Sequence, residues 1–272
     1  MIKNISARSI WESALILPDY RDFKESMIQE LCFYYKINRQ EVLNRFNNIV
    51  KASKDEWEAK ERSYQKQIVD FYDQSDNYIF EHVQWHINHG HCGESVWALN
   101  VAKKGKYIKY LDFGSGIGST GILFAKNGFN VTVADISSKM LQFAECRFNL
   151  RGINGCFLDL KRGILKKNEY EFITAIDVFE HLNDPMKTLN EISSSLKQDG
   201  LLFIEATYGI DRDRPMHIIR KGPSIRDFYK NSLTIIFKSG DTLLCKKEGK
   251  NASLIRSYIN ILKRSDRMGI SA

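Results

Sequence analysis

Asp112, Gly114, Gly116 and Gly118 form the pattern D-x-G-x-G-x-G directly after a short apolar run, a spacing suited to holding a nucleotide cofactor. Glycines lack a Cβ atom, so the chain can turn sharply from strand to helix and approach a ligand closely. Seventeen residues after Gly118, a strand-like run ends on Asp135. A carboxylate at that place can accept hydrogen bonds from ribose hydroxyls. The spacing predicts one pocket formed by a glycine turn and two acids.

The same segment also satisfies a second cofactor pattern, because Gly116 to Gly121 read G-x-G-x-x-G, as in dinucleotide-binding loops. The glycines alone do not decide between the two cofactor classes. A carboxylate at the tip of the first strand suits an ammonium or hydroxyl group and repels a pyrophosphate. Asp112 therefore favours a cationic cofactor.

A cluster of histidines and aromatic residues precedes this loop. It contains Tyr78, His82, Trp85, His86, His89 and His91. His82 and His86 are four residues apart and share a helical face. These residues leave three interpretations open. They could line the cofactor or substrate pocket, form a packed polar helix face, or bind a metal with His89 or His91 completing the site. We expect Tyr78, His82 and Trp85 to contact substrate or the lid, and we expect no metal.

Two more histidines follow predicted strands and are candidates for moving a proton. His181 comes directly after a strand, and His217 lies in a polar loop with Arg212 and Arg214. The arginines can bind a carboxylate through paired hydrogen bonds, although a solvated loop is the alternative. We expect His181, His217 or His86 to contact the acceptor, with His181 slightly favoured because the scaffold positions it.

The elements that must position these residues alternate from residue 107 onward. Strands are predicted at 107–113, 131–135, 172–177 and 201–206, and helices at 121–126, 138–150 and 186–196. Such alternation predicts a mainly parallel sheet with helices on both faces and the ligand at its carboxyl edge. A hairpin is expected between residues 233 and 245.

The first 93 residues are expected to form an all-helical cap or lid, and residues 94–272 the cofactor domain. Helix starts are predicted at Asn38 and Ser53, each with a glutamate three residues later, and a further helix at 77–88. An apolar stripe is expected at Trp57, Tyr64, Ile68 and Phe71.

Residues from about Lys106 to Phe237 resemble class I S-adenosylmethionine (SAM) dependent methyltransferases. The resemblance rests on the glycine segment, on Asp135, on residues 156–160, on the strand and loop at 172–185, and on residues 196–205. It implies a Rossmann-like fold with SAM as cofactor and places Asp159 near the adenine amino group. The cofactor-binding residues it implies are Asp112, Gly114, Ser115, Gly116, Gly118, Asp135, Ile136, Asp159, Leu160 and Asp177.

The composition of the chain argues against several classes of protein. The 272 residues are 43% hydrophobic and carry a net charge of +7, as in a globular protein. No secretion signal or apolar span is found, and five scattered cysteines argue against a disulfide frame, so a cytoplasmic location is expected. Residues 207–272 are basic, but the charges alternate with apolar residues and a nucleic-acid partner is not favoured.

Together these features predict transfer of a methyl group from SAM to O, N or C of a small molecule, in a pocket that the cap shields from water. Three alternatives remain. They are an enzyme that transfers or cyclises the aminocarboxypropyl arm of SAM, a non-catalytic SAM-binding module, and an NAD-dependent oxidoreductase. A homodimer is possible, and no membrane partner is expected.

Overall fold

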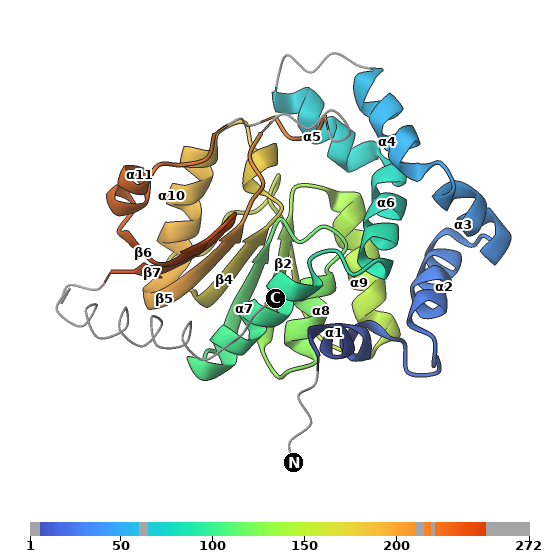
Figure 1. Cartoon of the computed structure of the whole chain (residues 1–272), viewed down its shortest axis with the longest axis horizontal. Coiled ribbons are helices and arrows are strands. Elements are labelled where there is room, and N and C mark those ends of the chain that lie inside the picture. Colours follow the sequence, from blue (N-terminus) through green and yellow to red (C-terminus); the bar gives the residue numbers. More distant parts are fainter. Residues whose placement is uncertain (1–5, 60–64, 210–214, 219–220, 249–272) are drawn as a thin grey trace.

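The structure is a computed structural model, which describes residues 6–59, 65–209, 215–218 and 221–248 (Figure 1). The helices before the first strand are α1 (Ala7–Leu15), α2 (Phe23–Tyr35), α3 (Arg39–Phe46), α4 (Ile49–Glu58), α5 (Gln65–Gln74), α6 (Asp76–Ile87) and α7 (Cys92–Lys104). The parallel part contains β1 (Lys109–Phe113), α8 (Ser119–Ala125), β2 (Asn130–Asp135), α9 (Ser138–Leu150), β3 (Cys156–Asp159), β4 (Tyr170–Ile176), the 3-10 helix η1 (Phe179–His181), α10 (Pro185–Ser195) and β5 (Leu196–Glu205). It is followed by α11 (Ile225–Lys230), β6 (Leu233–Ser239) and β7 (Thr242–Lys247).

The strands form one seven-stranded sheet in the order β3-β2-β1-β4-β5-β7-β6. β1 to β5 pair in parallel, whereas β7 is antiparallel to both β5 and β6. This arrangement confirms the predicted Rossmann-like sheet with a C-terminal antiparallel hairpin. The strand order reverses between β1 and β4, and in open sheets of this kind a ligand binds at such a reversal, beyond the carboxyl ends of the strands.

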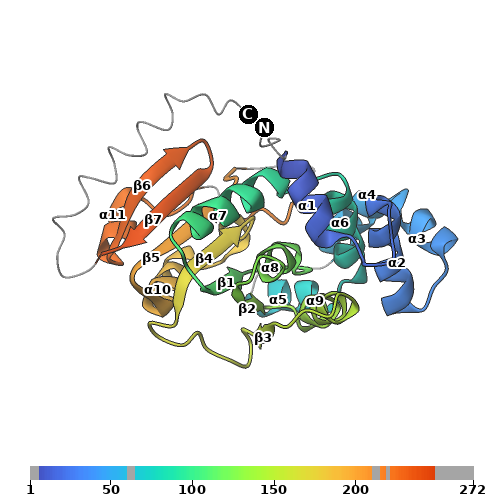
Figure 2. The ribbon, with the colours of Figure 1, turned by 90° about the horizontal axis from the view of Figure 1, so that it is seen from below.

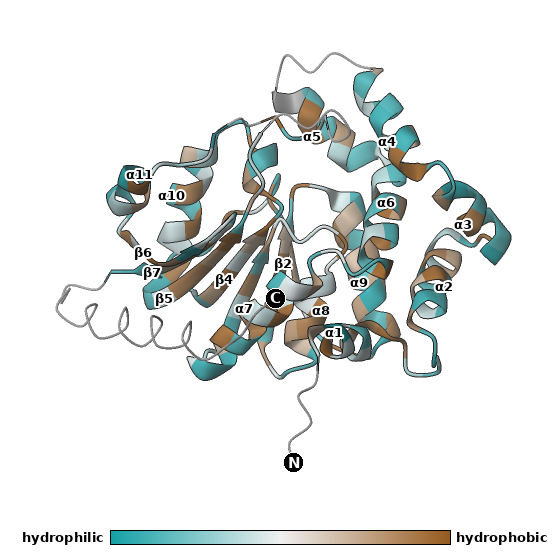
Figure 3. Ribbon diagram, viewed as in Figure 1, coloured by the Kyte–Doolittle hydropathy of each residue, from teal (hydrophilic) through white to brown (hydrophobic). Residues whose placement is uncertain are grey.

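Successive residues of a strand face opposite sides of the sheet, and this alternation divides the core in two. Tyr110 packs in the cluster formed with α1, α2 and α6 to α9, while its neighbour Leu111 packs in the cluster formed with α10 and α11. Figure 2 shows α7 and α10 on opposite sides of the sheet. The strands of the sheet are apolar, whereas the outer surfaces of the helices are largely hydrophilic (Figure 3).

The N-terminal helices divide into two groups. Trp11, Met27 and Phe80 belong to the same hydrophobic cluster as α8 and α9, so α1, α2 and α6 share the core of the sheet domain. Trp57, Ile68 and Phe71 instead form a small separate cluster with Met216, which follows β5 in the chain. Within this second group, α5 packs over the carboxyl edge of the sheet (Figure 1), and α6 of the first group also reaches this edge through Tyr78 and His82.

A buried ion network joins α2 to α9. Glu30 pairs with Arg147 and Arg151, and the side chains of all three are fully buried. Arg147 also donates to the carbonyl oxygen of Ile117 and to Ser119 Oγ, each at 2.7 Å. Through α9, the network thereby connects α2 to the glycine loop and to the first residue of α8.

Most predicted elements are confirmed, with one difference at a helix start and one additional helix. Asn38 and Glu41 form the expected capping box, but the prediction for Ser53 is wrong, because α4 begins after Asn48 and Ser53 lies buried inside it. Residues 92–104 form the single helix α7 across the segment where the boundary of the cap was expected. Tyr64 lies outside the described residues. Within the described part of the chain, no helix is long and apolar enough to cross a membrane.

Candidate active site

A cavity of about 420 Å³ lies at the point where the strand order reverses. Its lining comes from the carboxyl ends of β1, β2 and β4, from α5 and α6, and from the first turns of α10. The lining residues that the sequence predicted are Tyr78, His82, Gly114, Gly116, Asp135, Ile136, Leu160, Asp177 and His181. The cavity is large enough for a cofactor of nucleotide size, because ligand pockets usually span about 300–1,000 Å³.

The glycine loop forms the floor of this cavity. Gly114 and Gly116 have φ angles of +67° and +52°, a left-handed conformation that side chains disfavour. A Cβ on Gly114 would lie 2.4 Å from Val178, and a Cβ on Gly116 would lie 3.3 Å from His82. Gly118 does not line the cavity; a Cβ there would lie 2.9 Å from Ala144, so this glycine allows close packing on α9.

Asp135 faces the cavity and supports the loop. Its Oδ2 accepts from the backbone N–H of Gly116 and its Oδ1 from that of Ser137, both at 2.8 Å. Burial raises the pKa of Asp135 to about 6, against these hydrogen bonds, which lower it. Each carboxylate oxygen retains a second lone pair for a ligand hydroxyl.

Two other predicted acids hold the scaffold and do not line the cavity. Asp112 accepts from the N–H of Gly121 at 2.8 Å and from Thr174 Oγ1 at 3.2 Å, and burial raises its pKa to about 7. Asp159 accepts from Ser138 Oγ at 2.8 Å. Asp112 is thus directed at α8 and β4, and Asp159 at α9; their contacts with a cofactor stay predictions.

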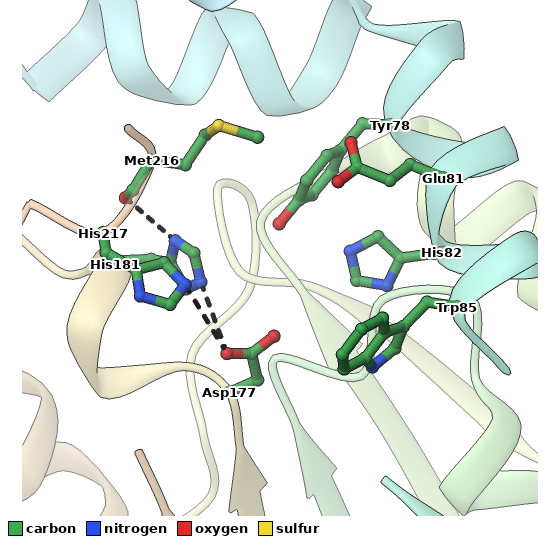
Figure 4. Close-up of a pocket in the computed structure, with 8 residues that line it drawn as sticks. All are labelled: Tyr78, Glu81, His82, Trp85, Asp177, His181, Met216 and His217. Atoms are coloured by element: carbon green, nitrogen blue, oxygen red, sulfur yellow. Dashed lines mark hydrogen bonds and ion pairs between the residues drawn. The ribbon is translucent and has the colours of Figure 1, made fainter. Parts of the chain in front are cut away.

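Asp177 lies beside the cavity close to three histidines, two of which, His181 and His217, are drawn in Figure 4. Asp177 Oδ1 lies 3.8 Å from Nε2 of His181 and 3.9 Å from Nε2 of His217, and its Oδ2 lies 3.4 Å from Nε2 of His91. Although burial opposes it, the neighbouring imidazoles of His181 and His91 hold the pKa of Asp177 well below its usual range. Asp177 has a φ of +56°, a strained conformation that persists where the surrounding structure enforces it.

The ring of His181 is oriented through its Nδ1 atom. This nitrogen lies 3.0 Å from the carbonyl oxygen of Met216 and 3.1 Å from the hydroxyl of Tyr72. Because a carbonyl only accepts, Nδ1 carries a proton and the lone pair of the neutral ring is on Nε2. In the described part of the chain, this buried Nε2 has no hydrogen-bond partner.

A small pocket of about 50 Å³ adjoins the cavity. It is lined by Tyr78, Glu81, His82, Trp85, Asp177, His181, Met216 and His217. Asp177 and His181 line both spaces, as do Tyr78 and His82. Burial lowers the pKa of His82 to about 4, so this ring is neutral beside the pocket.

The other candidates lie elsewhere. His86 is buried against Trp11, lies 2.7 Å from Ser119 Oγ through Nδ1, and lines neither space, so the structure does not place it for acceptor contact. His89 contacts Glu12 at 2.7 Å, so the four histidines between residues 82 and 91 do not converge on one point. Ser115 lies in the glycine loop, and Arg212 and Arg214 lie outside the described residues.

Three residues near this cluster were not among the predicted site residues, although the sequence places His91 in the histidine cluster. His91 contacts Asp177, and its pKa is raised because hydrogen bonding to this acid outweighs burial. Glu205, at the end of β5, has its pKa raised to about 7 by burial. Tyr72 reaches His181 from α5. Position at a strand end was a signal for Glu205, and the density of histidines was a signal for His91, whereas no local pattern distinguished Tyr72.

Comparison with known proteins agrees with this geometry. Residues 85–230 match the sequence model of the methyltransferase domain family, and the chain belongs to this family. A ubiquinone biosynthesis O-methyltransferase of Coxiella burnetii is 29% identical over 105 residues, which are 38% of this chain and 44% of the relative. A malonyl-[acyl-carrier protein] O-methyltransferase of Acetivibrio thermocellus is 31% identical over 104 residues, covering 38% of this chain and 36% of the relative. The chain thus spans less than half the length of these relatives.

Among solved structures, a SAM-dependent methyltransferase from Clostridium acetobutylicum superposes with a TM-score of 0.46 at 15% identity, over 57% of this chain and 91% of that one. SAM is the cofactor that the family implies. The residues present fit it: the glycine loop leaves room that a Cβ at Gly116 would reduce, and Asp135 faces the cavity. Ser115 Oγ is buried and, among the described residues, without a hydrogen-bond partner.

Proposed function

We propose that the protein transfers the methyl group of SAM to a hydroxyl group of a small molecule. One observation carries the proposal: Asp177 and His181 line both the cofactor-sized cavity and the small pocket beside it. A group held in the small pocket therefore lies next to the cavity and to side chains that bind or move a proton. The O-methyltransferase names of the two relatives also support an oxygen acceptor.

In this proposal the cofactor supplies an electrophilic methyl group, and the residues of the chain bind and align the reactants. The Gly114 and Gly116 backbone and Asp135 hold the cofactor, with Ile136 and Leu160 as the apolar contacts. His181 and His217 contact the acceptor region. The small pocket of about 50 Å³ receives the reacting group of the acceptor in this proposal.

The helical lid is proposed to be α4 and α5. Tyr72 contacts His181, Asp73 Oδ1 accepts from the N–H of Ser138 at 2.7 Å, and Met216 packs on the same cluster as Phe71. These contacts close α5 over the carboxyl edge and exclude water from the reacting groups.

The experiment is product analysis. Purified protein is incubated with SAM and a panel of phenols, alcohols and amines, and products are identified by mass spectrometry. We expect S-adenosylhomocysteine together with a methyl ether. Methylthioadenosine would indicate transfer of the aminocarboxypropyl arm, and an exclusively N- or C-methylated product would overturn the choice of oxygen.

A further inference from the structure

We propose that Asp177, His181 and His217 bind a divalent transition-metal ion, which in turn binds the acceptor oxygen; the second part of this inference rests on the proposed function. One ligand atom from each of the three residues lies within 4.8 Å of the other two. Two imidazoles and one carboxylate are a ligand set that binds Zn²⁺, Fe²⁺ or Mn²⁺ and leaves coordination positions open for water or substrate.

The distances in this cluster are long for hydrogen bonds. Asp177 Oδ1 lies 3.8 Å and 3.9 Å from the two Nε2 atoms, whereas a charge-assisted N–H···O bond is about 2.8 Å long. Tetrahedral ligands at about 2.1 Å from an ion lie about 3.4 Å apart. Small side-chain movements would therefore give ion-binding geometry. His181 and His217 also meet edge to face, with ring centroids 4.8 Å apart, so their Nε2 atoms approach one oxygen from different directions (Figure 4).

The surroundings of the ligands provide a second, independent observation. Metal-binding histidines commonly donate their other ring N–H to a carbonyl or carboxylate, which fixes the tautomer. His181 Nδ1 faces the Met216 carbonyl oxygen at 3.0 Å, so the lone pair is on Nε2, directed toward Asp177. Within the described residues, this Nε2 is buried and has no hydrogen-bond partner. The remaining Asp177 oxygen lies 3.4 Å from His91 Nε2, which can orient the carboxylate from outside the ligand set.

The position of the site suggests what the ion does. Asp177 and His181 line the cofactor-sized cavity as well as the small pocket, so an ion between them faces both. An acceptor hydroxyl that binds the ion loses its proton to solvent water more easily, because a cation stabilises the resulting oxyanion. The oxygen lone pair then forms the O–CH₃ bond, while the electrons of the C–S bond remain on sulfur and yield S-adenosylhomocysteine.

The first test measures metal binding without reference to activity. Full-length protein is freed of metal with a chelator and titrated with Zn²⁺ in a calorimeter and with Co²⁺ by visible absorption. We expect one ion per chain and cobalt d–d bands of a site with nitrogen and oxygen ligands. Mg²⁺ should bind far more weakly, because it prefers oxygen ligands. Absence of stoichiometric Zn²⁺ and Co²⁺ binding would overturn the site.

Variants locate the ion. His217→Ala and His181→Asn should each weaken Zn²⁺ binding at least about 100-fold, since each removes a direct ligand. The matched control is His82→Gln, which changes a neutral histidine of the same pocket outside the ligand set and should leave Zn²⁺ affinity within about three-fold. Circular dichroism and cooperative unfolding in urea show that the variants are folded. Equal Zn²⁺ binding in all four proteins would place the ion elsewhere and refute the inference.

The role of the ion is tested separately from the reaction class. If methyl ether forms with the metal-loaded protein, removal of the ion should lower kcat at least about 100-fold, and Zn²⁺ or Mn²⁺ should restore it. Undiminished methyl transfer by metal-free protein would refute the catalytic role while the proposed function stands. Metal binding without any methylated product would count against the proposed function and leave the ion site intact.

Discussion

The hydroxyl of Tyr72 lies 3.1 Å from Nδ1 of His181, although the two residues are 109 positions apart in the chain. The contact joins α5, in the N-terminal helical region, to the loop after β4, where His181 also contacts the carbonyl oxygen of Met216. A residue of the proposed lid thus touches the histidine that borders both the cavity and the small pocket. The same contact therefore holds α5 over the site and orients the ring of His181.

Removing this contact is expected to affect turnover. Tyr72→Phe deletes one hydrogen bond worth about 1 kcal/mol and should lower kcat/KM about five-fold, because α5 and the His181 ring lose a shared contact. The control is Tyr229→Phe, which changes an exposed tyrosine on α11. Steady-state kinetics compare the two variants with wild type. Equal kcat/KM values in all three proteins would count against the lid.

Asp135 is expected to determine cofactor affinity. Asp135→Ala should weaken binding of S-adenosylhomocysteine about 10- to 100-fold, because hydrogen bonds to the loop and to the ribose contribute about 1 kcal/mol each. Asp159→Ala is the matched control, since this acid also ends a strand but is directed at Ser138, outside the cavity lining. Calorimetric titration measures both. An equal loss in the two variants would show that Asp135 has no particular role.

Gly116 is expected to tolerate no side chain. Its φ is +52°, and a Cβ would lie 3.3 Å from His82 at the cavity. Gly116→Ala should weaken cofactor binding because the added methyl group occupies space in the cavity. It should also add backbone strain of about 1–2 kcal/mol. Gly128→Ala separates these effects, because Gly128 has a φ of +85° but nothing within 4 Å of a Cβ. Both variants should be destabilised in urea, and only Gly116→Ala should bind S-adenosylhomocysteine poorly.

The Glu30 network is expected to dominate the attachment of α2. Glu30→Gln leaves Arg147 and Arg151 buried without their counterion and should lower the free energy of unfolding by about 3–5 kcal/mol. The control Glu25→Gln removes an ion pair with Arg39 that is partly exposed, and should cost less than about 1 kcal/mol. Urea denaturation measures both changes. Similar costs for the two variants would contradict a special role of the buried network.

Asp112 is expected to make stability depend on pH. Burial raises its pKa from 3.8 to about 7, so between these values the folded state binds more protons than the unfolded state. The free energy of unfolding should therefore fall as pH rises from about 4 to 7, by up to about 1.4 kcal/mol per pH unit from this group. Asp112→Asn removes the titration while keeping an acceptor for Gly121. The decrease from pH 4.5 to 7.5 should be smaller in the variant when both proteins are measured without ligand.

Local patterns in the sequence were enough to determine the sheet and the glycine loop. Strand and helix periodicity depends on neighbouring residues, and a positive φ at Gly114 and Gly116 is a requirement that only glycine meets easily. The position of Asp135 at the end of β2 followed from the same strand periodicity. A parallel sheet brings the carboxyl ends of its strands to one edge, which is why the location of the cavity was predictable.

The direction of individual side chains was decided only by the tertiary structure. Asp112 and Asp135 both belong to the ends of strands, yet Asp135 faces the cavity and Asp112 caps a helix, because each carboxylate is directed by the N–H groups that packing presents to it. His86 and His217 were equal candidates in the sequence. Packing against Trp11 holds His86 away from both spaces, whereas His217 Nε2 lies 3.9 Å from Asp177 Oδ1. Contacts of this kind depend on packing between segments that are distant in the chain, and the spacing of residues in the sequence does not predict them.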